Sequence, residues 1–158
     1  MRRVVLIAVA IALADQLTKL LVLRAVDPAH PVVIVDGFFR LVHWGNTGAA
    51  WGIFQDSNIL LAVISVLTVI ALYLFRHSFQ IHLVGSQVAL GLIAGGITGN
   101  VVDRFWHGYV VDFLDFYIDG HHWPAFNIAD SAICCGVVLY VLVSVCAERR
   151  ESKSVAEA

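Results

Sequence analysis

The stretch ILLAVISVLTVIALYLF, which is Ile59–Phe75, contains no charged residue. A helix needs about 20 largely apolar residues to cross the hydrocarbon core of a bilayer. Largely apolar runs recur along the chain, at Val4–Leu23, Leu83–Val102 and Ile128–Ala147. We therefore expect an all-α integral membrane protein, with four transmembrane helices in a single domain that spans residues 1–158.

The overall composition also indicates a membrane protein. Of the 158 residues, 59% are hydrophobic and 14% are charged, and the mean hydropathy is +0.83. A soluble domain carries about 25% charged residues, which cover its surface. This composition excludes a cytosolic globular domain and a disordered chain. Ten Lys and Arg residues against twelve Asp and Glu leave no basic excess, so we expect no nucleic-acid partner.

Positive charges beside the apolar runs predict the orientation, because Lys and Arg in short flanks stay on the cytoplasmic side. They occur before the first run, between the second and third, and after the fourth: Arg2, Arg3, Arg76, Arg149, Arg150 and Lys153. These charges outweigh Arg24, Arg40 and Arg104 on the opposite side. Both termini are therefore expected in the cytoplasm, with extracytoplasmic connections at about 24–58 and 103–127.

The first apolar run has a second interpretation. Arg2-Arg3, the run Val4–Ile11 and Ala12-Leu13-Ala14 resemble the three parts of a cleavable secretory signal. The apolar stretch resumes after Lys19, however, and continues through Leu23. This continuation favours an uncleaved membrane helix over a signal peptide that is removed.

The two outer connections contain segments that favour strands. In the first, Val32–Val35 and Phe38–Trp44 flank Asp36-Gly37, a pair suited to the positive φ angles of a two-residue hairpin turn. In the second, Val110–Ile118 has an extended composition. We expect a small extracytoplasmic β-hairpin region, whose apolar side chains rest on the membrane surface.

Polar residues in the apolar runs are candidates for function, because ionisable groups at membrane depth are costly. Asp15 and Lys19 are four residues apart, so they face each other on one helix and could simply neutralise each other. Asn100 and Arg104 have the same spacing. Arg104 could extend its charge to the interface, but Asn100 is too short for that, which favours hydrogen bonding inside the helix bundle.

Two aspartates lie at the predicted outer boundary of the membrane. Asp130 opens the fourth run, where Asn127 can cap the helix and the helix N-terminus favours a carboxylate. Asp112 lies between Val111 and Phe113 with no evident local partner, so a distant partner must be sought. If the two carboxyl groups meet, they cannot both ionise and will share one proton. Such a pair can deprotonate water and protonate an amide leaving group, which is aspartic proteolysis.

Five short segments carry most of these polar residues, in order along the chain: DQLTK at Asp15–Lys19, NTGAA at Asn46–Ala50, GNVVDR at Gly99–Arg104, VVDF at Val110–Phe113 and PAFNIADSA at Pro124–Ala132. In sequence, order and spacing, they resemble the successive motifs of bacterial lipoprotein signal peptidase, the signal peptidase II family. One such motif would be weak evidence, whereas five in register are a specific signal.

The resemblance implies an aspartic endopeptidase of the bacterial inner membrane with its site toward the extracytoplasmic side. Its substrates would be diacylglyceryl-modified prolipoproteins, cut just before the lipidated cysteine, with membrane lipid as a further partner and no cofactor or metal. Asp112 and Asp130 match the catalytic pair. The other motif positions, which line or support the site, match Asp15, Lys19, Asn46, Gly48, Asn100, Arg104 and Asn127. We expect the protein to act as a monomer.

Two other classes of function remain open from the residues alone. A small proton-coupled transporter would also use membrane carboxylates, but along a path near mid-membrane, whereas most of these lie at one edge. A metallohydrolase would draw on Asp112, Asp115, Asp119, His121 and His122. Its two histidines are adjacent rather than at a helical ligand spacing, and the chain contains no H-E-x-x-H motif, which argues against a metal site.

Overall fold

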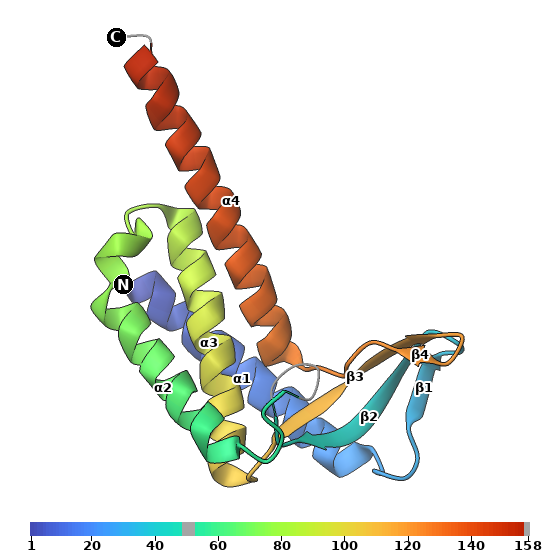
Figure 1. The fold of residues 1–158 in the computed structure, drawn as a ribbon. Helices are drawn as coiled ribbons and strands as arrows, with labels where there is room; N and C mark the ends of the chain where they lie inside the picture. Colours follow the sequence, from blue (N-terminus) through green and yellow to red (C-terminus); the bar gives the residue numbers. More distant parts are fainter. Residues whose placement is uncertain (49–52, 157–158) are drawn as a thin grey trace.

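The computed structural model describes residues 1–48 and 53–156. The four apolar runs are helical, and each helix begins and ends within a few residues of the expected bounds, except that the last one continues into the polar tail. The helices are α1 (Arg2–Ala25), α2 (Asn58–Leu74), α3 (Val84–Trp106) and α4 (Ile128–Ala156), with a short 3-10 helix, η2 (Arg76–Phe79), between α2 and α3. Figure 1 shows the strands at one end of the helix bundle and the C-terminal part of α4 projecting beyond the other end.

Length and hydropathy distinguish the helices. Among the described residues, three helical segments are long and apolar enough to cross a membrane: Arg2–Ala25, Val84–Trp106 and Ile128–Arg150. The remaining long helix, α2, is also apolar but has 17 residues. The bundle exposes large apolar side chains such as Leu13 and Leu67 and buries polar ones such as Asp15. This distribution is the reverse of that in a soluble protein and fits a lipid environment.

Helix α3 is the centre of the bundle and packs against α1, α2 and α4. Small residues allow these close approaches. A Cβ atom added at Gly96 would lie 2.3 Å from the carbonyl oxygen of Ala129 in α4. One added at Gly99 would lie 2.5 Å from Oδ2 of Asp15 in α1. The glycines of α3 therefore allow the first turn of α4 and the polar part of α1 to pack closely against α3.

The strands form one four-stranded antiparallel sheet in the order β1-β2-β3-β4. Their bounds are Val32–Val35 for β1, Phe39–Asn46 for β2, Val110–Ile118 for β3 and His121–His122 for β4. The expected hairpin of β1 and β2 is confirmed. The expected extended segment Val110–Ile118 is strand β3, and its pairing with β2 and with β4 makes the sheet larger than the expected hairpin and the fold more than all-α. A hairpin alone leaves a row of unpaired backbone groups on β2, and β3 pairs with them.

The hairpin turn also differs from the expected two-residue turn. Val35 pairs with Phe39, so three residues connect the strands. Phe38 N–H donates to the carbonyl of Val35 at 3.1 Å, and Gly37 has a φ of +71°. Asp36 is not among the residues with positive φ. Of the three turn residues, only Gly37 has a left-handed conformation. A bulge in the pairing of β1 with β2 accommodates the third residue of the turn.

Strand β3 is fixed next to the helix ends by a side-chain contact and by backbone hydrogen bonds along one edge. Phe113 packs with Val22 and Val26 of α1 in a small buried cluster. The backbone N–H groups of Phe113 and Leu114 both donate to the carbonyl of Phe126, just before α4. The sheet thus lies across the ends of α1, α3 and α4 and brings β3 beside the first turn of α4.

Candidate active site

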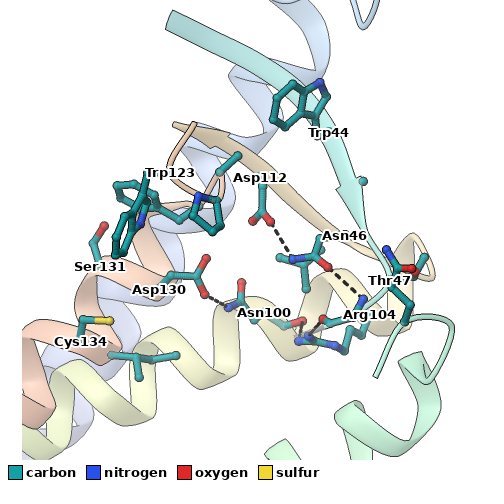
Figure 2. Close-up of a pocket in the computed structure, with 18 residues that line it drawn as sticks. Trp44, Asn46, Thr47, Asn100, Arg104, Asp112, Trp123, Asp130, Ser131 and Cys134 are labelled. Atoms are coloured by element: carbon teal, nitrogen blue, oxygen red, sulfur yellow. Dashed lines mark hydrogen bonds between the residues drawn. The ribbon is translucent and has the colours of Figure 1, made fainter. Parts of the chain in front are cut away.

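A cavity of about 820 Å³ opens between the sheet and the adjoining ends of α3 and α4. Its walls come from β2, β3, α3, α4 and the segment 123–126. Asp112 and Asp130 both line it, one from the sheet and one from a helix. Figure 2 shows their carboxyl groups directed into the same space. The two aspartates that the sequence singled out are therefore brought together.

Asp112 is held by two asparagines. Asn46 Nδ2 donates to Oδ2 at 2.9 Å, and Asn127 Nδ2 donates to Oδ1 at 2.8 Å. Only 4% of the residue is exposed. Burial, together with the nearby charge of Asp130, raises the pKa of Asp112 to about 7, although the two asparagine hydrogen bonds and Lys19 oppose the rise. Asp112 is therefore poised to hold a proton near neutral pH.

Asp130 lies in the first turn of α4, in the position expected from the sequence. Its backbone N–H donates to Oδ1 of Asn127 at 3.0 Å, which confirms Asn127 as the helix cap. The carboxylate accepts from two donors: Asn100 Nδ2 reaches Oδ1 at 2.7 Å, and the N–H of Asn127 reaches Oδ2 at 3.2 Å. Donors from α3 and from the start of α4 thus hold both oxygens of Asp130.

Lys19 and Asp15 form the expected ion pair, with Nζ 2.8 Å from Asp15 Oδ2, but the pair is part of a larger network. Lys19 Nζ also lies 2.8 Å from Asp103 Oδ2 and donates to Asn100 Oδ1 at 2.9 Å. The other oxygen of Asp15 accepts from the N–H of Ala129 at 2.9 Å. The pair therefore neutralises charge and also connects α1 to both α3 and the start of α4.

Arg104 lines the cavity, and its guanidinium group is bonded to backbone carbonyls there. Its Nη2 donates to the carbonyl of Gly48 at 3.1 Å, and its Nη1 to the carbonyl of Asn100 at 3.4 Å. Gly48 N–H in turn donates to Asn46 Oδ1 at 2.9 Å. The last two residues of the NTGAA segment lie outside the described residues, so the structure places only the first three.

Sequence reasoning missed several residues of this region. Asp103 is fully buried and bonded to Lys19 and to the N–H of Val111 at 3.0 Å. Its position three residues after Asn100 was a signal for the same helix face. Trp44 lines the cavity because it pairs with Asp112 across the strands, and Trp123 also lines it. No local signal marks these tryptophans, because strand register alone brings Trp44 to Asp112.

The residues considered for a metal site do not all lie together. Asp115 is three positions from Asp112 on β3, so it points to the opposite face of the strand. It accepts from Arg40 Nε at 2.6 Å and lies 2.9 Å from His122 Nδ1. Within residues 1–48 and 53–156, no group of three or more His, Cys, Asp or Glu is placed to hold a metal ion.

Comparison with known proteins decides the family. The sequence model of the family described as signal peptidase (SPase) II matches residues 7–146. The chain belongs to the signal peptidase II family. It is therefore a protease and, with its several long apolar helices, a multi-pass membrane protein. Membership of a protease family argues against the alternative of a small proton-coupled transporter.

Relatives and solved structures agree with membership of the signal peptidase II family. Proteins named lipoprotein signal peptidase from Desulforapulum autotrophicum and Geobacter sulfurreducens are 41% and 39% identical to this chain. The first alignment covers 88% of this chain and 89% of the relative, and the second 87% and 88%. A similar protein from Bacillus pumilus is 40% identical, over 85% of this chain and 86% of the relative.

Two solved structures share the signal peptidase II fold seen here. Both are described as bacterial membrane enzyme structures obtained by the in meso method, and both are 33% identical to this chain. The first has a TM-score of 0.83 and covers 92% of this chain and 88% of its own. The second has a TM-score of 0.75 and covers 90% and 92%.

Proposed function

We propose that this signal peptidase II removes signal peptides from diacylglyceryl-modified prolipoproteins by aspartic catalysis, cutting just before the lipidated cysteine. The observation that carries the proposal is the meeting of Asp112 and Asp130 in one cavity, each held by asparagine donors. Paired carboxyl groups with one shared proton can act as base and acid in the same reaction.

The environments of the two carboxyl groups suggest their roles. Asp112 holds the proton because its pKa is raised to about 7, chiefly by burial. Asp130 is the ionised partner, since three features favour its negative charge: the start of α4, Asn100 and the N–H of Asn127. The pair titrates as a unit, so measured values belong to both groups.

Peptide hydrolysis follows from these roles. Asp130 removes a proton from water as the water oxygen attacks the scissile carbonyl carbon, and Asp112 gives its proton to the carbonyl oxygen. The tetrahedral intermediate then collapses: the C–N bond breaks, Asp130 delivers its proton to the leaving nitrogen, and the proton of the former carbonyl oxygen returns to Asp112. The amide nitrogens of Asn46, Asn100 and Asn127 keep both carboxyl groups in place.

The topology we propose has four membrane-spanning helices in the bacterial inner membrane, with both termini in the cytoplasm. The dyad then lies at the extracytoplasmic ends of α3 and α4, where a membrane-spanning signal peptide presents its cleavage site. Val32–Val35 and Phe38 of the hairpin are exposed and apolar, which suits a sheet resting on the membrane surface. The diacylglyceryl chains of the substrate stay in the bilayer, and the enzyme acts as a monomer.

Cleavage of a lipid-modified prolipoprotein by the purified protein in detergent tests this function. We expect the modified precursor to be cut and the unmodified precursor to be left intact. Mass spectrometry of the product should find the diacylglyceryl cysteine at its N-terminus. A product that begins at another residue, or equal cleavage of both precursors, contradicts the proposed substrate.

The catalytic type is tested in the same assay with a metal chelator. Aspartic catalysis by Asp112 and Asp130 needs only their carboxyl groups and water, so activity should persist with the chelator. Activity that disappears with chelator and returns with zinc would contradict the aspartic mechanism while leaving the substrate assignment intact.

A further inference from the structure

Three asparagine side chains contact the two aspartates, and in each one the amide oxygen is held by a separate donor. Asn46 Oδ1 accepts from the N–H of Gly48, and Asn127 Oδ1 accepts from the N–H of Asp130. Asn100 Oδ1 accepts from the ammonium group of Lys19 at 2.9 Å. Asn100 therefore differs from the other two, because a charged side chain from another helix holds its amide.

The chemistry of Lys19 determines which way the Asn100 amide points. An ammonium group can only donate hydrogen bonds, so the atom of Asn100 that faces Lys19 must be the oxygen. The NH₂ group must then face Asp130, where Nδ2 lies 2.7 Å from Oδ1. The reversed amide would put NH₂ against the ammonium group and an oxygen against the carboxylate, which are two repulsive contacts.

Lys19 is itself fixed, so it can act as an anchor. Only 2% of the residue is exposed, and its Nζ lies 2.8 Å from carboxylate oxygens of both Asp15 and Asp103. Asp15 and Asp103 are fully buried. An ion pair between Lys19 and Asp15 would satisfy charge without any contact to Asn100, so the third contact requires a separate explanation.

We propose that Lys19 is a positioning residue for peptide cleavage: by holding Asn100 Oδ1, it keeps the Asn100 NH₂ on Asp130 and so keeps Asp130 Oδ1 a hydrogen-bond acceptor. This inference rests on the proposed catalytic role of Asp130. It assigns to Lys19 an effect on catalysis that passes through Asn100, in addition to its effect on stability.

Several charged groups surround Asp130 and bear on any pH dependence. Lys19 and Asp15 approach from α1, Arg104 from α3 and Asp112 from β3. The positive charge of Lys19 also acts on the Asp130 carboxyl group directly, through space. A test must therefore separate the direct effect of Lys19 from the effect that passes through Asn100.

A double-mutant cycle makes this separation. With the lipid-modified precursor and purified full chain, we expect Lys19→Met to lower kcat about 10- to 100-fold with KM changed less than about threefold. We also expect the acidic limb of the pH profile to move to higher pH, because a donor and a positive charge are lost. In the Asn100→Ala background, the same substitution should lower kcat less than about threefold. Equal factors in both backgrounds would overturn the inference.

Gln16 provides a matched control on the same helix. Its Nε2 donates to Asp103 Oδ1 at 2.8 Å, so it belongs to the polar network, but it has no bond to Asn100. Gln16→Leu should lower thermal stability and leave the pH profile of kcat in place. If Gln16→Leu moves the acidic limb as far as Lys19→Met does, the effect of Lys19 is only structural and the inference is wrong.

A second variant tests the inference even if Lys19→Met fails to fold. Asn100→Asp preserves volume and keeps a partner for Lys19, but it presents an oxygen to Asp130 instead of a donor. We expect activity at about pH 7 to fall at least about 100-fold and to recover partly toward about pH 5, where the new carboxyl group is protonated and can donate. A pH profile that matches Asn100→Ala would overturn the proposed role of amide orientation.

The outcomes for Asp130 itself keep the two proposals apart. If Asp130→Asn retains activity, the catalytic dyad is wrong, and the role of Lys19 is wrong with it. If Asp130→Asn is inactive while Lys19→Met and Asn100→Ala combine additively, the dyad stands and only the positioning role of Lys19 is lost.

Discussion

Asn127 and Asp130 cap each other at the start of α4. The N–H of Asp130 donates to Asn127 Oδ1 at 3.0 Å, and the N–H of Asn127 donates to Asp130 Oδ2 at 3.2 Å. Because Asn127 Nδ2 also donates to Asp112, one residue starts the helix and contacts both carboxyl groups. The geometry of the dyad is thus coupled to the N-terminus of α4.

We predict that Asp112→Asn and Asp130→Asn each lower cleavage by about two to four orders of magnitude, because each removes one half of the proton transfer. The measurement is kcat with the lipid-modified precursor. Asp115→Asn is a suitable comparison, since Asp115 lies on the opposite face of β3 and pairs with Arg40. Turnover close to that of the wild type in either dyad variant would show that the pair is not catalytic.

We predict that activity falls as pH rises through about 7, because Asp112 must be protonated to act as the acid and its pKa is raised to about 7. Asn46→Ala removes a hydrogen bond that lowers this pKa, so the decline should move to higher pH even as the rate drops. The check is the pH profile of kcat for both proteins. A decline that stays in place, or that moves to lower pH, would count against Asp112 as the acid.

We predict that Arg104→Ala and Asn100→Ala reduce kcat/KM by at least about tenfold with a smaller effect on folding, because both side chains face the cavity. Activity and thermal unfolding in detergent should be measured together. Arg24→Ala serves as a control, since Arg24 is an exposed arginine at the end of α1. If Arg104→Ala behaves like Arg24→Ala, its contact with Gly48 has no part in catalysis.

We predict that Gly96→Ala destabilises the protein by roughly 1–3 kcal/mol, as overpacking does in well-packed cores. The added Cβ would lie 2.3 Å from the carbonyl oxygen of Ala129, so α4 must move, and Asp130 moves with it. Unfolding temperature and activity should both fall. Thr98→Ala, at an exposed position of the same helix, should change neither by much. An unchanged Gly96→Ala protein would show that α3 and α4 are not packed this closely.

Much of the local structure was determined by the sequence alone. Uncharged runs such as Ile59–Phe75 predicted helices, because only a helix satisfies its own backbone in an apolar environment. The Asp-Gly pair at Asp36 marked a hairpin, and Asn127 was recognisable as a helix cap from its place before Ile128. The order of the five motifs also predicted the signal peptidase II family, and the family model that matches residues 7–146 confirms this prediction.

The tertiary structure alone decided which distant residues meet. Trp44 lies opposite Asp112 because β2 and β3 pair in one register, and Lys19 reaches Asn100 because glycines of α3 admit α1 closely. These partners are 68 and 81 residues apart, and helical or strand periodicity reports only on near neighbours along the chain. The sequence could therefore name most of the polar residues of the site, but packing of the sheet across the helix ends decided their partners.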